Sequence, residues 1–127
     1  MIKGDNMADY FFLINENENN REYVSNERWW IGGDSFAQVL GKNGRVPFVK
    51  GYGDYYFKMG YGKYTLTQKE CHEIGEILKE KFGVMKYSHK DQMKADPFFA
   101  HEVNLAYSVG ERLLNATEDD KFIAYWQ

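Results

Sequence analysis

The sequence predicts an α+β fold: a single domain in which an antiparallel β-meander of five to seven short strands packs against two main helices. Eight of the twelve glycines lie between Gly32 and Gly62 and separate short aromatic segments, which is typical of antiparallel strands joined by turns. From Thr67 onward the apolar residues recur at helical spacing instead. No linker or internal repeat divides the chain, so residues 1–127 are expected to form one domain, with residues 1–7 as a frayed leader.

The composition provides enough apolar surface for one hydrophobic core. Of the 127 residues 43% are hydrophobic, and ten Tyr, nine Phe and three Trp argue against disorder. Cys71 is the only cysteine, which excludes an intramolecular disulfide and a multi-cysteine zinc site. The apolar run at residues 10–14 is too short for a signal peptide or a membrane span. We therefore expect a cytoplasmic protein that contacts no membrane and holds neither metal nor cofactor.

The first half of the chain is expected to consist mostly of strands. Residues 9–14 have the pattern of a buried strand, and the acidic, asparagine-rich residues 15–20 form a turn from which residues 21–25 return as a hairpin. Asp34 is expected to cap a short helix that ends at Gly41. Further strands are predicted at residues 29–31, 45–50, 54–59 and 61–66, with a terminal strand at residues 122–126.

The first main helix has the clearest start signal in the sequence. Thr67, with Glu70 three residues further on, forms a capping box ahead of an apolar stripe. The helix is predicted over residues 68–82 and is expected to stop at Gly83, because glycine commonly follows the last helical residue. Residues 84–87 are then expected to form a short strand.

The second main helix is predicted over residues 97–115. Asp96 and Pro97 provide its start, since aspartate caps a helix well and proline is tolerated at the first helical position. Gly110 in its interior costs up to about 1 kcal/mol relative to alanine unless another element packs closely against it.

The sequence motifs assemble no catalytic or metal site. His72 and Glu76 lie one helical turn apart but lack a third metal ligand, so we expect them on an ion-paired surface. Ser35 stands between a strand and a helix, as in a nucleophile elbow, yet the chain is too short for the parallel sheet that such an elbow requires. His101 fits a hydrogen-bonded histidine at the core boundary, and Cys71 is expected to pack in the core.

Charge is distributed unevenly along the chain. The net charge of −3 combines −4 over residues 1–27, +5 over residues 42–69 and −4 over residues 70–127. The basic segment also contains seven aromatic residues, so cations and rings are interleaved. Three interpretations follow: the rings pave the core face while the lysines face solvent, the rings form a protein-binding patch, or the rings stack on nucleic-acid bases.

We expect a non-enzymatic binding protein that inhibits or occludes a macromolecular partner, such as a nucleic-acid enzyme. Its acidic side chains would meet a basic patch and mimic phosphate charge. Small, acidic, aromatic-rich chains of this general character include phage anti-defence inhibitors and toxin-immunity proteins. The predicted partner-binding residues are Glu16, Glu18, Glu22, Glu27, Trp29, Tyr52, Tyr55 and Tyr61.

The alternative is a single-stranded nucleic-acid or nucleotide binder built on the basic, tyrosine-rich hairpins of residues 42–69. In that interpretation Lys50, Lys58 and Lys63 neutralise phosphates while Tyr64 and the other tyrosines stack on bases. The negative net charge and the acidic flanks argue against it. An enzyme ranks third, because no acid, base and nucleophile converge in the sequence.

Overall fold

The computed structural model describes residues 10–17, 20–27 and 30–127. This part of the chain is α+β, with six strands and four helices. The strands are β1 (Phe11–Asn17), β2 (Asn20–Glu27), β3 (Phe48–Gly51), β4 (Asp54–Phe57), β5 (Gly62–Thr65) and β6 (Phe122–Trp126). The helices are α2 (Gly33–Lys42), α3 (Gln68–Ser88), α4 (Lys90–Ala95) and α5 (Pro97–Leu114).

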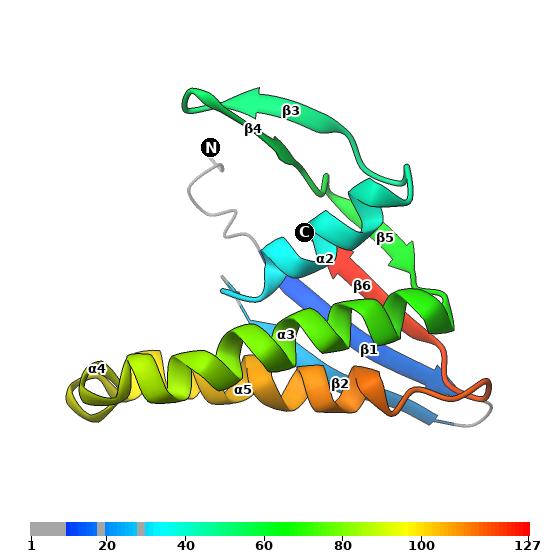
Figure 1. Cartoon of the computed structure of the whole chain (residues 1–127). Coiled ribbons are helices and arrows are strands. Elements are labelled where there is room, and N and C mark those ends of the chain that lie inside the picture. The colour runs from blue at the N-terminus through cyan, green and yellow to red at the C-terminus, as the bar shows by residue number, and fades with distance from the viewer. Residues whose placement is uncertain (1–9, 18–19, 28–29) are drawn as a thin grey trace, which may run out of the picture.

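Four of the strands form one antiparallel sheet in the order β2-β1-β6-β5 (Figure 1). The C-terminal strand β6 therefore lies inside the sheet, between β1 and β5. Strands β3 and β4 pair only with each other and form a separate two-stranded sheet. The predicted α+β class and hairpin β1–β2 are confirmed. The single meander is wrong, because β3 and β4 leave the main sheet.

One face of the main sheet is covered by helices. Along β1, Phe11 and Leu13 belong to the core that also contains the buried side chains of α2, α3 and α5. Side chains alternate between the two faces of a strand, so Phe12 and Ile14 point to the opposite face. A register shift between Leu13 and Ile14 marks a bulge in β2. The core thus lies between the sheet and the helices.

Helices α3 and α5 pack at unusually close range where two glycines meet. A methyl group on Gly75 would lie 2.8 Å from the carbonyl oxygen of Gly110 and from the backbone nitrogen of Leu114. The reciprocal methyl group on Gly110 would lie 2.9 Å from the backbone nitrogen of Lys79. This close approach is the condition under which the low helix propensity of Gly110 is offset.

The predicted capping box of α3 is present. Thr67 Oγ1 accepts a hydrogen bond from Glu70 N, while the Glu70 carboxylate accepts one from Thr67 N, both at 3.0 Å. Glu70 is only 2% exposed, and Arg45 and Asn43 donate to the same carboxylate. This buried network connects the start of α3 to the loop that follows α2.

The predicted end of α3 at Gly83 is wrong, and so is the strand at residues 84–87. The helix continues to Ser88, and Gly83 lies in its interior beside the Tyr107 ring of α5. Packing along α5 over this length outweighs the low helix propensity of one glycine. The two long helices therefore run alongside each other as a pair.

The start of α2 also differs from the prediction. Trp30 and Ile31 are not in a strand, and Trp29 lies outside the described residues. The helix is preceded by Gly32 without a side-chain cap, so Asp34 lies in the first turn instead of capping it. Trp30 instead enters the core, where its ring stacks on Phe11 with 5.1 Å between centroids.

The cap of α5 is as predicted. The Asp96 carboxylate accepts hydrogen bonds from Phe98 N and Phe99 N, both at 3.1 Å, and Pro97 occupies the first turn. The helix then runs to Leu114, close to the expected boundary.

Candidate functional site

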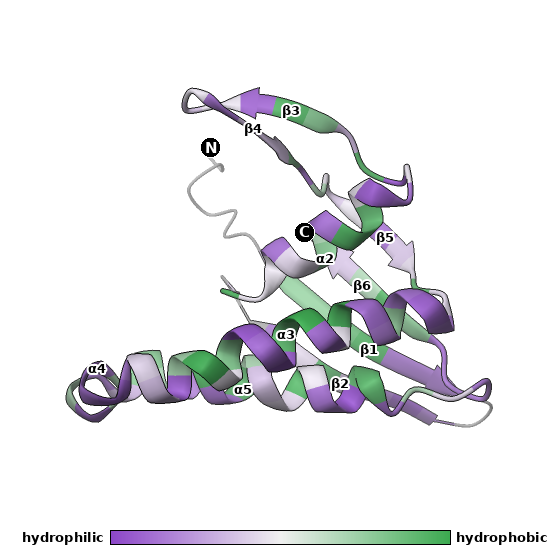
Figure 2. Cartoon of the chain, viewed as in Figure 1, coloured by the Kyte–Doolittle hydropathy of each residue, from purple (hydrophilic) through white to green (hydrophobic). Residues whose placement is uncertain are grey.

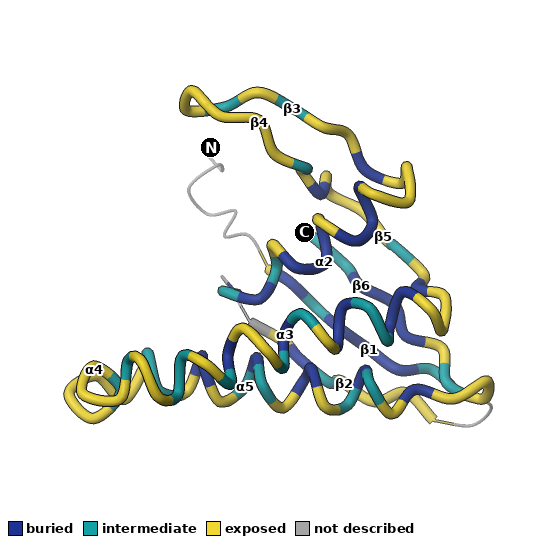
Figure 3. The backbone as a smooth tube through the Cα atoms, viewed as in Figure 1, coloured by how far each residue is buried: buried dark blue, intermediate teal, exposed yellow. Residues whose placement is uncertain are grey.

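The two-stranded sheet β3–β4 projects from the body of the protein, and we refer to residues 48–57 as the arm (Figure 1). Figure 3 shows it as mostly exposed, although Figure 2 marks the first part of β3 as hydrophobic. Its tip is a tight turn in which Tyr52 and Gly53 have φ values of 54° and 87°. Two consecutive positive φ values are the signature of a hairpin turn that matches strand twist. Tyr52 is therefore held at the tip, fully exposed.

Aromatic rings are presented on one face of the arm. Phe48 and Tyr55 are stacked with 5.6 Å between centroids, and the Lys50 ammonium lies 5.8 Å from the Tyr55 ring centroid. Phe48 is 58% exposed and Tyr55 is 62% exposed. Monomeric surfaces seldom expose clustered large rings without a binding role. The interpretation in which these rings pave the core is wrong for Tyr52 and Tyr55.

The base of the arm is fixed to the body. The Phe57 ring occupies the space beside Gly41 of α2, where any larger residue would overlap it. Val46 and Met59, on either side of the arm, are buried in the core. The amide of Lys58 also donates to the carbonyl of Pro47 at 2.9 Å. The arm is thus attached at its base, while its tip makes no packing contribution to the core.

A cavity of about 600 Å³ lies at the base of the arm. This size is within the range of pockets that hold a small molecule or a partner side chain. Trp30 is 5% exposed and its indole N–H is buried without a hydrogen-bond partner in the described part of the chain. An unsatisfied buried donor is unfavourable by about 1–3 kcal/mol. The cavity is lined by Phe11, Trp30, Ile31, Gly33, Asp34, Ala37, Tyr56, Phe57, Lys58, Met59, Gly60, Tyr61 and Trp126.

Sequence reasoning found only part of this site. It selected Tyr52, Tyr55 and Tyr61, and the structure places Tyr61 on the cavity wall, near the arm. It missed Trp30 and Trp126, which the sequence pattern assigns to strands. The only available signal was a tryptophan two residues before the Gly32–Gly33 pair. Gly32 leaves room for the Trp30 ring, since a methyl group on Gly32 would lie 2.7 Å from that ring.

The predicted acidic residues do not form one surface in the structure. Glu16 pairs with Arg21 at 3.8 Å, and Glu22 pairs with Arg112 of α5 at 2.8 Å. Glu22 is the cross-strand partner of Asn15, so both side chains lie on the same face of the sheet. Glu16 is the next residue after Asn15 on β1 and points to the other face, so the Glu16 and Glu22 carboxylates lie on opposite faces. They also lie near the β1–β2 turn, at the opposite end of β1 from the arm (Figure 1).

The structure does not describe the side chains of three predicted site residues. Glu18 and Trp29 lie outside the described residues, and Glu27 is described only as a backbone position at the end of β2.

The residues of the predicted nucleic-acid site are also separated. Lys50 lies on the arm and Lys58 on the cavity wall, whereas Lys63 lies on β5 with its ammonium 5.9 Å from the Tyr125 ring centroid. Tyr64 packs against the core and donates its hydroxyl to the carbonyl of Gly60 at 2.9 Å. Residues 42–69 therefore do not present one continuous aromatic and basic surface.

The candidate catalytic residues are placed in structural roles. Ser35 is 2% exposed in α2, and His72 Nε2 lies 3.0 Å from the carbonyl oxygen of Ala116. Within residues 10–17, 20–27 and 30–127, no three His, Cys, Asp or Glu side chains are grouped as a metal site would require. His101 is exposed on α5, which corrects its expected position at the core boundary.

Cys71 is buried in the core, as predicted, and is 2% exposed. Burial, followed by the charges of Glu70 and Asp120, raises the pKa of its thiol to about 12. Because the thiolate is the reactive form, we expect alkylation of the folded protein at pH 8 to be at least on the order of 10³-fold slower than in denaturant. Mass spectrometry of timed iodoacetamide reactions measures this. Rapid labelling with unchanged circular dichroism would contradict the burial.

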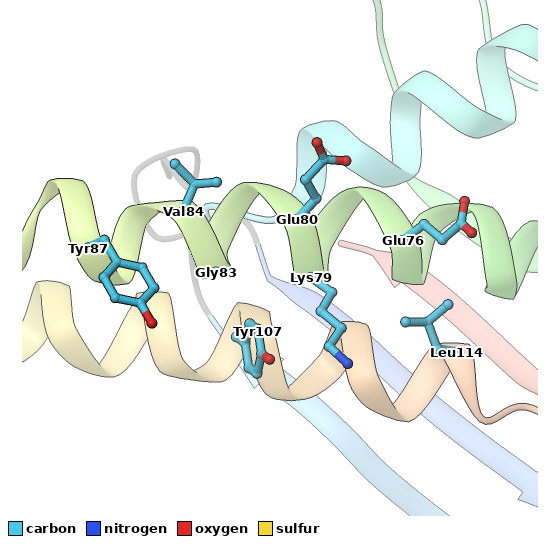
Figure 4. Close-up of a pocket in the computed structure, with 8 residues that line it drawn as sticks. All are labelled: Glu76, Lys79, Glu80, Gly83, Val84, Tyr87, Tyr107 and Leu114. Carbon is cyan, nitrogen blue, oxygen red and sulfur yellow. The ribbon is translucent and has the colours of Figure 1, made fainter.

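A second hollow, of about 700 Å³, lies between α3 and α5 (Figure 4). Figure 4 shows that its side chains do not converge: Glu80 and Val84 point away from α5, while Lys79 reaches towards it. The Lys86 ammonium lies 3.8 Å from the centroid of the Tyr107 ring, so that ring already has a cation partner. This hollow is an open groove that directs no set of functional groups at a ligand.

Comparison of the chain with protein-family models, with curated proteins and with solved structures finds no match. Among the described residues, no helix combines the length and the apolar character needed to cross a membrane.

Proposed function

We propose that this chain is a non-enzymatic binding protein that docks on a protein partner through the arm and the cavity at its base, and so occludes that partner's working surface. The observation that carries the proposal is the exposed cluster of Phe48, Tyr52 and Tyr55 on a projecting hairpin. Aromatic side chains of this kind supply a large share of binding energy at protein interfaces. Inhibitors of the phage anti-defence or toxin-immunity type would act by such occlusion.

The cavity supplies a second contact within the same interface. An aromatic or aliphatic side chain of the partner would enter it and displace water from the Trp30, Tyr61 and Trp126 side chains.

The arm is a better contact than the acidic hairpin in this proposal. Glu16 and Glu22 already have arginine partners within the chain, so a basic partner protein would first have to compete with those pairs. The arm carries one cation and one carboxylate, Lys50 and Asp54, and the cavity lining likewise includes one of each, Lys58 and Asp34. The proposed partner is therefore recognised mainly by shape and apolar contact, and a nucleic-acid enzyme in the cytoplasm is the example we favour.

The test is a capture experiment with matched tyrosine variants. Tagged wild type is compared with the double variant Tyr52→Ala/Tyr55→Ala and with Tyr87→Ala, which removes a tyrosine that is 86% exposed on α3. We expect wild type and Tyr87→Ala to retain the same protein from a lysate of the source cells after nuclease treatment. The arm variant is expected to bind it at least about tenfold more weakly, since each buried aromatic contributes roughly 1 kcal/mol or more.

Two results would count against this function. In the first, the arm variant retains the captured protein as well as wild type does. In the second, nuclease removes all captured material, which would indicate a nucleic-acid ligand instead of a protein.

A further inference from the structure

The face of the main sheet that points away from the helices carries aromatic rings and cations, and we call it the open face. It begins with Tyr10, which directly precedes β1 and stacks on Phe12, and it continues along β1 through Phe12 and Ile14, because side chains alternate along a strand. Ile14 and Ile123 are fully buried but do not belong to the core beneath the helices, which places them on this second face. Cross-strand register adds Arg21 and Tyr23 from β2, Tyr125 from β6, and Lys63 from β5.

The rings of the open face lie close together and are accessible. Tyr10 and Phe12 are stacked, with 5.8 Å between centroids and 16° between ring planes. Phe12 and Tyr125 are direct cross-strand partners, and Tyr23 on the edge strand is 59% exposed. A shallow depression of about 190 Å³ opens between them. It is lined by Phe12, Ile14, Arg21, Tyr23, Tyr125 and Gln127.

Each end of this aromatic set has a cation over it. The Arg21 guanidinium carbon lies 5.6 Å from the Tyr23 ring centroid, and the Lys63 ammonium lies 5.9 Å from that of Tyr125. Glu16 is the carboxylate that the β1–β2 register places on this face, and it is paired with Arg21 at 3.8 Å. In a chain with a net charge of −3, this face is therefore locally basic.

We propose that the open face binds single-stranded nucleic acid. Base rings would stack on Tyr23, Phe12 and Tyr125. Lys63 would neutralise a phosphate at one end, and at the other end Arg21 would exchange its 3.8 Å pair with Glu16 for a phosphate. A four-stranded sheet that presents aromatic rings in this way can hold two or three unpaired bases, because every base has a flat apolar face. A basic aromatic surface of this kind has better charge complementarity with a phosphate backbone than with an apolar protein surface.

This site goes beyond the proposed protein-binding function and uses different residues. Lys63 is shared with the nucleic-acid site expected from the sequence, whereas the rings are not. The arm and the open face can therefore be tested separately by variants that affect one and spare the other.

The experiment is fluorescence anisotropy with labelled oligothymidylate and oligouridylate of about 12 nucleotides, a length within the usual site size of such surfaces. Wild type is titrated at low and at moderate salt, alongside Tyr23→Ala, Tyr23→Phe and Lys63→Gln. Tyr52→Ala/Tyr55→Ala on the arm is the matched control. Circular dichroism and thermal unfolding establish that each variant is folded.

We expect wild type, Tyr23→Phe and the arm variant to bind alike, because all three keep the rings of the open face. Tyr23→Ala is expected to bind roughly 5- to 150-fold more weakly, as for the loss of one stacked base. Lys63→Gln should bind more weakly at low salt and show a smaller salt dependence, since one phosphate contact is lost.

Three outcomes would overturn the proposal: no binding of either oligonucleotide by wild type at low salt, equal binding by Tyr23→Ala and wild type, or a larger loss in the arm variant than in Tyr23→Ala.

Sedimentation velocity provides a fourth outcome that would overturn it. If wild type self-associates through this face and Tyr23→Ala does not, the face is a contact between two copies of the chain. The capture experiment with the arm variant is independent of all these results.

Discussion

Replacing Leu113 with alanine is expected to lower the free energy of unfolding by about 2–5 kcal/mol. Leu113 is fully buried on α5, in the core between the helices and the sheet. The substitution removes three carbon atoms from contact and leaves a cavity that tightly packed neighbours cannot fill completely. Urea denaturation followed by circular dichroism measures the change.

The neighbouring Leu114 provides a matched control, because the same substitution acts one residue further along the helix. Leu114 is partly exposed and lines the open groove between α3 and α5 (Figure 4). Leu114→Ala should therefore cost clearly less than Leu113→Ala, since its site can be filled by solvent. Equal losses in the two variants would show that α5 is rotated relative to the core described above.

Gly75→Ala is expected to destabilise the protein by roughly 1–3 kcal/mol, although alanine is ordinarily the better helix former. The added methyl group would lie 2.8 Å from backbone atoms of α5, and a backbone cannot move aside as a flexible side chain can. The two helices would have to separate, which weakens the packing along both. Thermal and urea unfolding measure the loss.

Gly83→Ala, on the same helix, is the control for helix propensity. Its methyl group would lie 3.3 Å from the Tyr107 ring, which can shift by a few tenths of an ångström. We expect this variant to be neutral or more stable by up to about 1 kcal/mol. If Gly75→Ala is stabilising to the same extent, the close approach of α3 and α5 is not as described.

The features predicted correctly from the sequence are those fixed by neighbouring residues. The capping box of Thr67 and Glu70 needs only a spacing of three residues, and the Asp96-Pro97 start of α5 needs only two adjacent residues. Gly110 was informative for a different reason: an unfavourable residue inside a helix indicates a compensating contact, and the structure supplies one at Gly75.

The features that were wrong depend on tertiary packing. Gly83 has the local pattern of a helix stop, but the helix continues through it because it packs against α5. The residue that Gly83 faces there, Tyr107, is 24 positions away in the sequence. The β3 and β4 segments have ordinary strand patterns, and nothing in those patterns states which strand each one will join. The same limit applies to Trp30, whose role depends on Phe11 in another element.

The candidate sites show this limit most clearly. Tyr52 and Tyr55 were selected because they fall in one basic, aromatic stretch, and that stretch became the exposed arm. The open face combines Phe12, Tyr23 and Tyr125, which come from the two ends of the chain. Only the register of β1 with β2 and β6 brings them together, and register is not visible in a single sequence.

The inner position of β6 has a consequence for how the chain folds during synthesis. The β1–β2 hairpin can form as soon as it leaves the ribosome, because its contacts are local. On its other side β1 pairs with β6, which is synthesised more than 100 residues later. The hydrogen bond between Asn15 and Asp120, for example, joins residues 105 positions apart. Until then β1 and β5 both have an unpaired edge, and closing the sheet requires a contact of high sequence separation. The main sheet is therefore expected to close only after β6 has been synthesised, and until then the unpaired edges are the surfaces that a chaperone would protect.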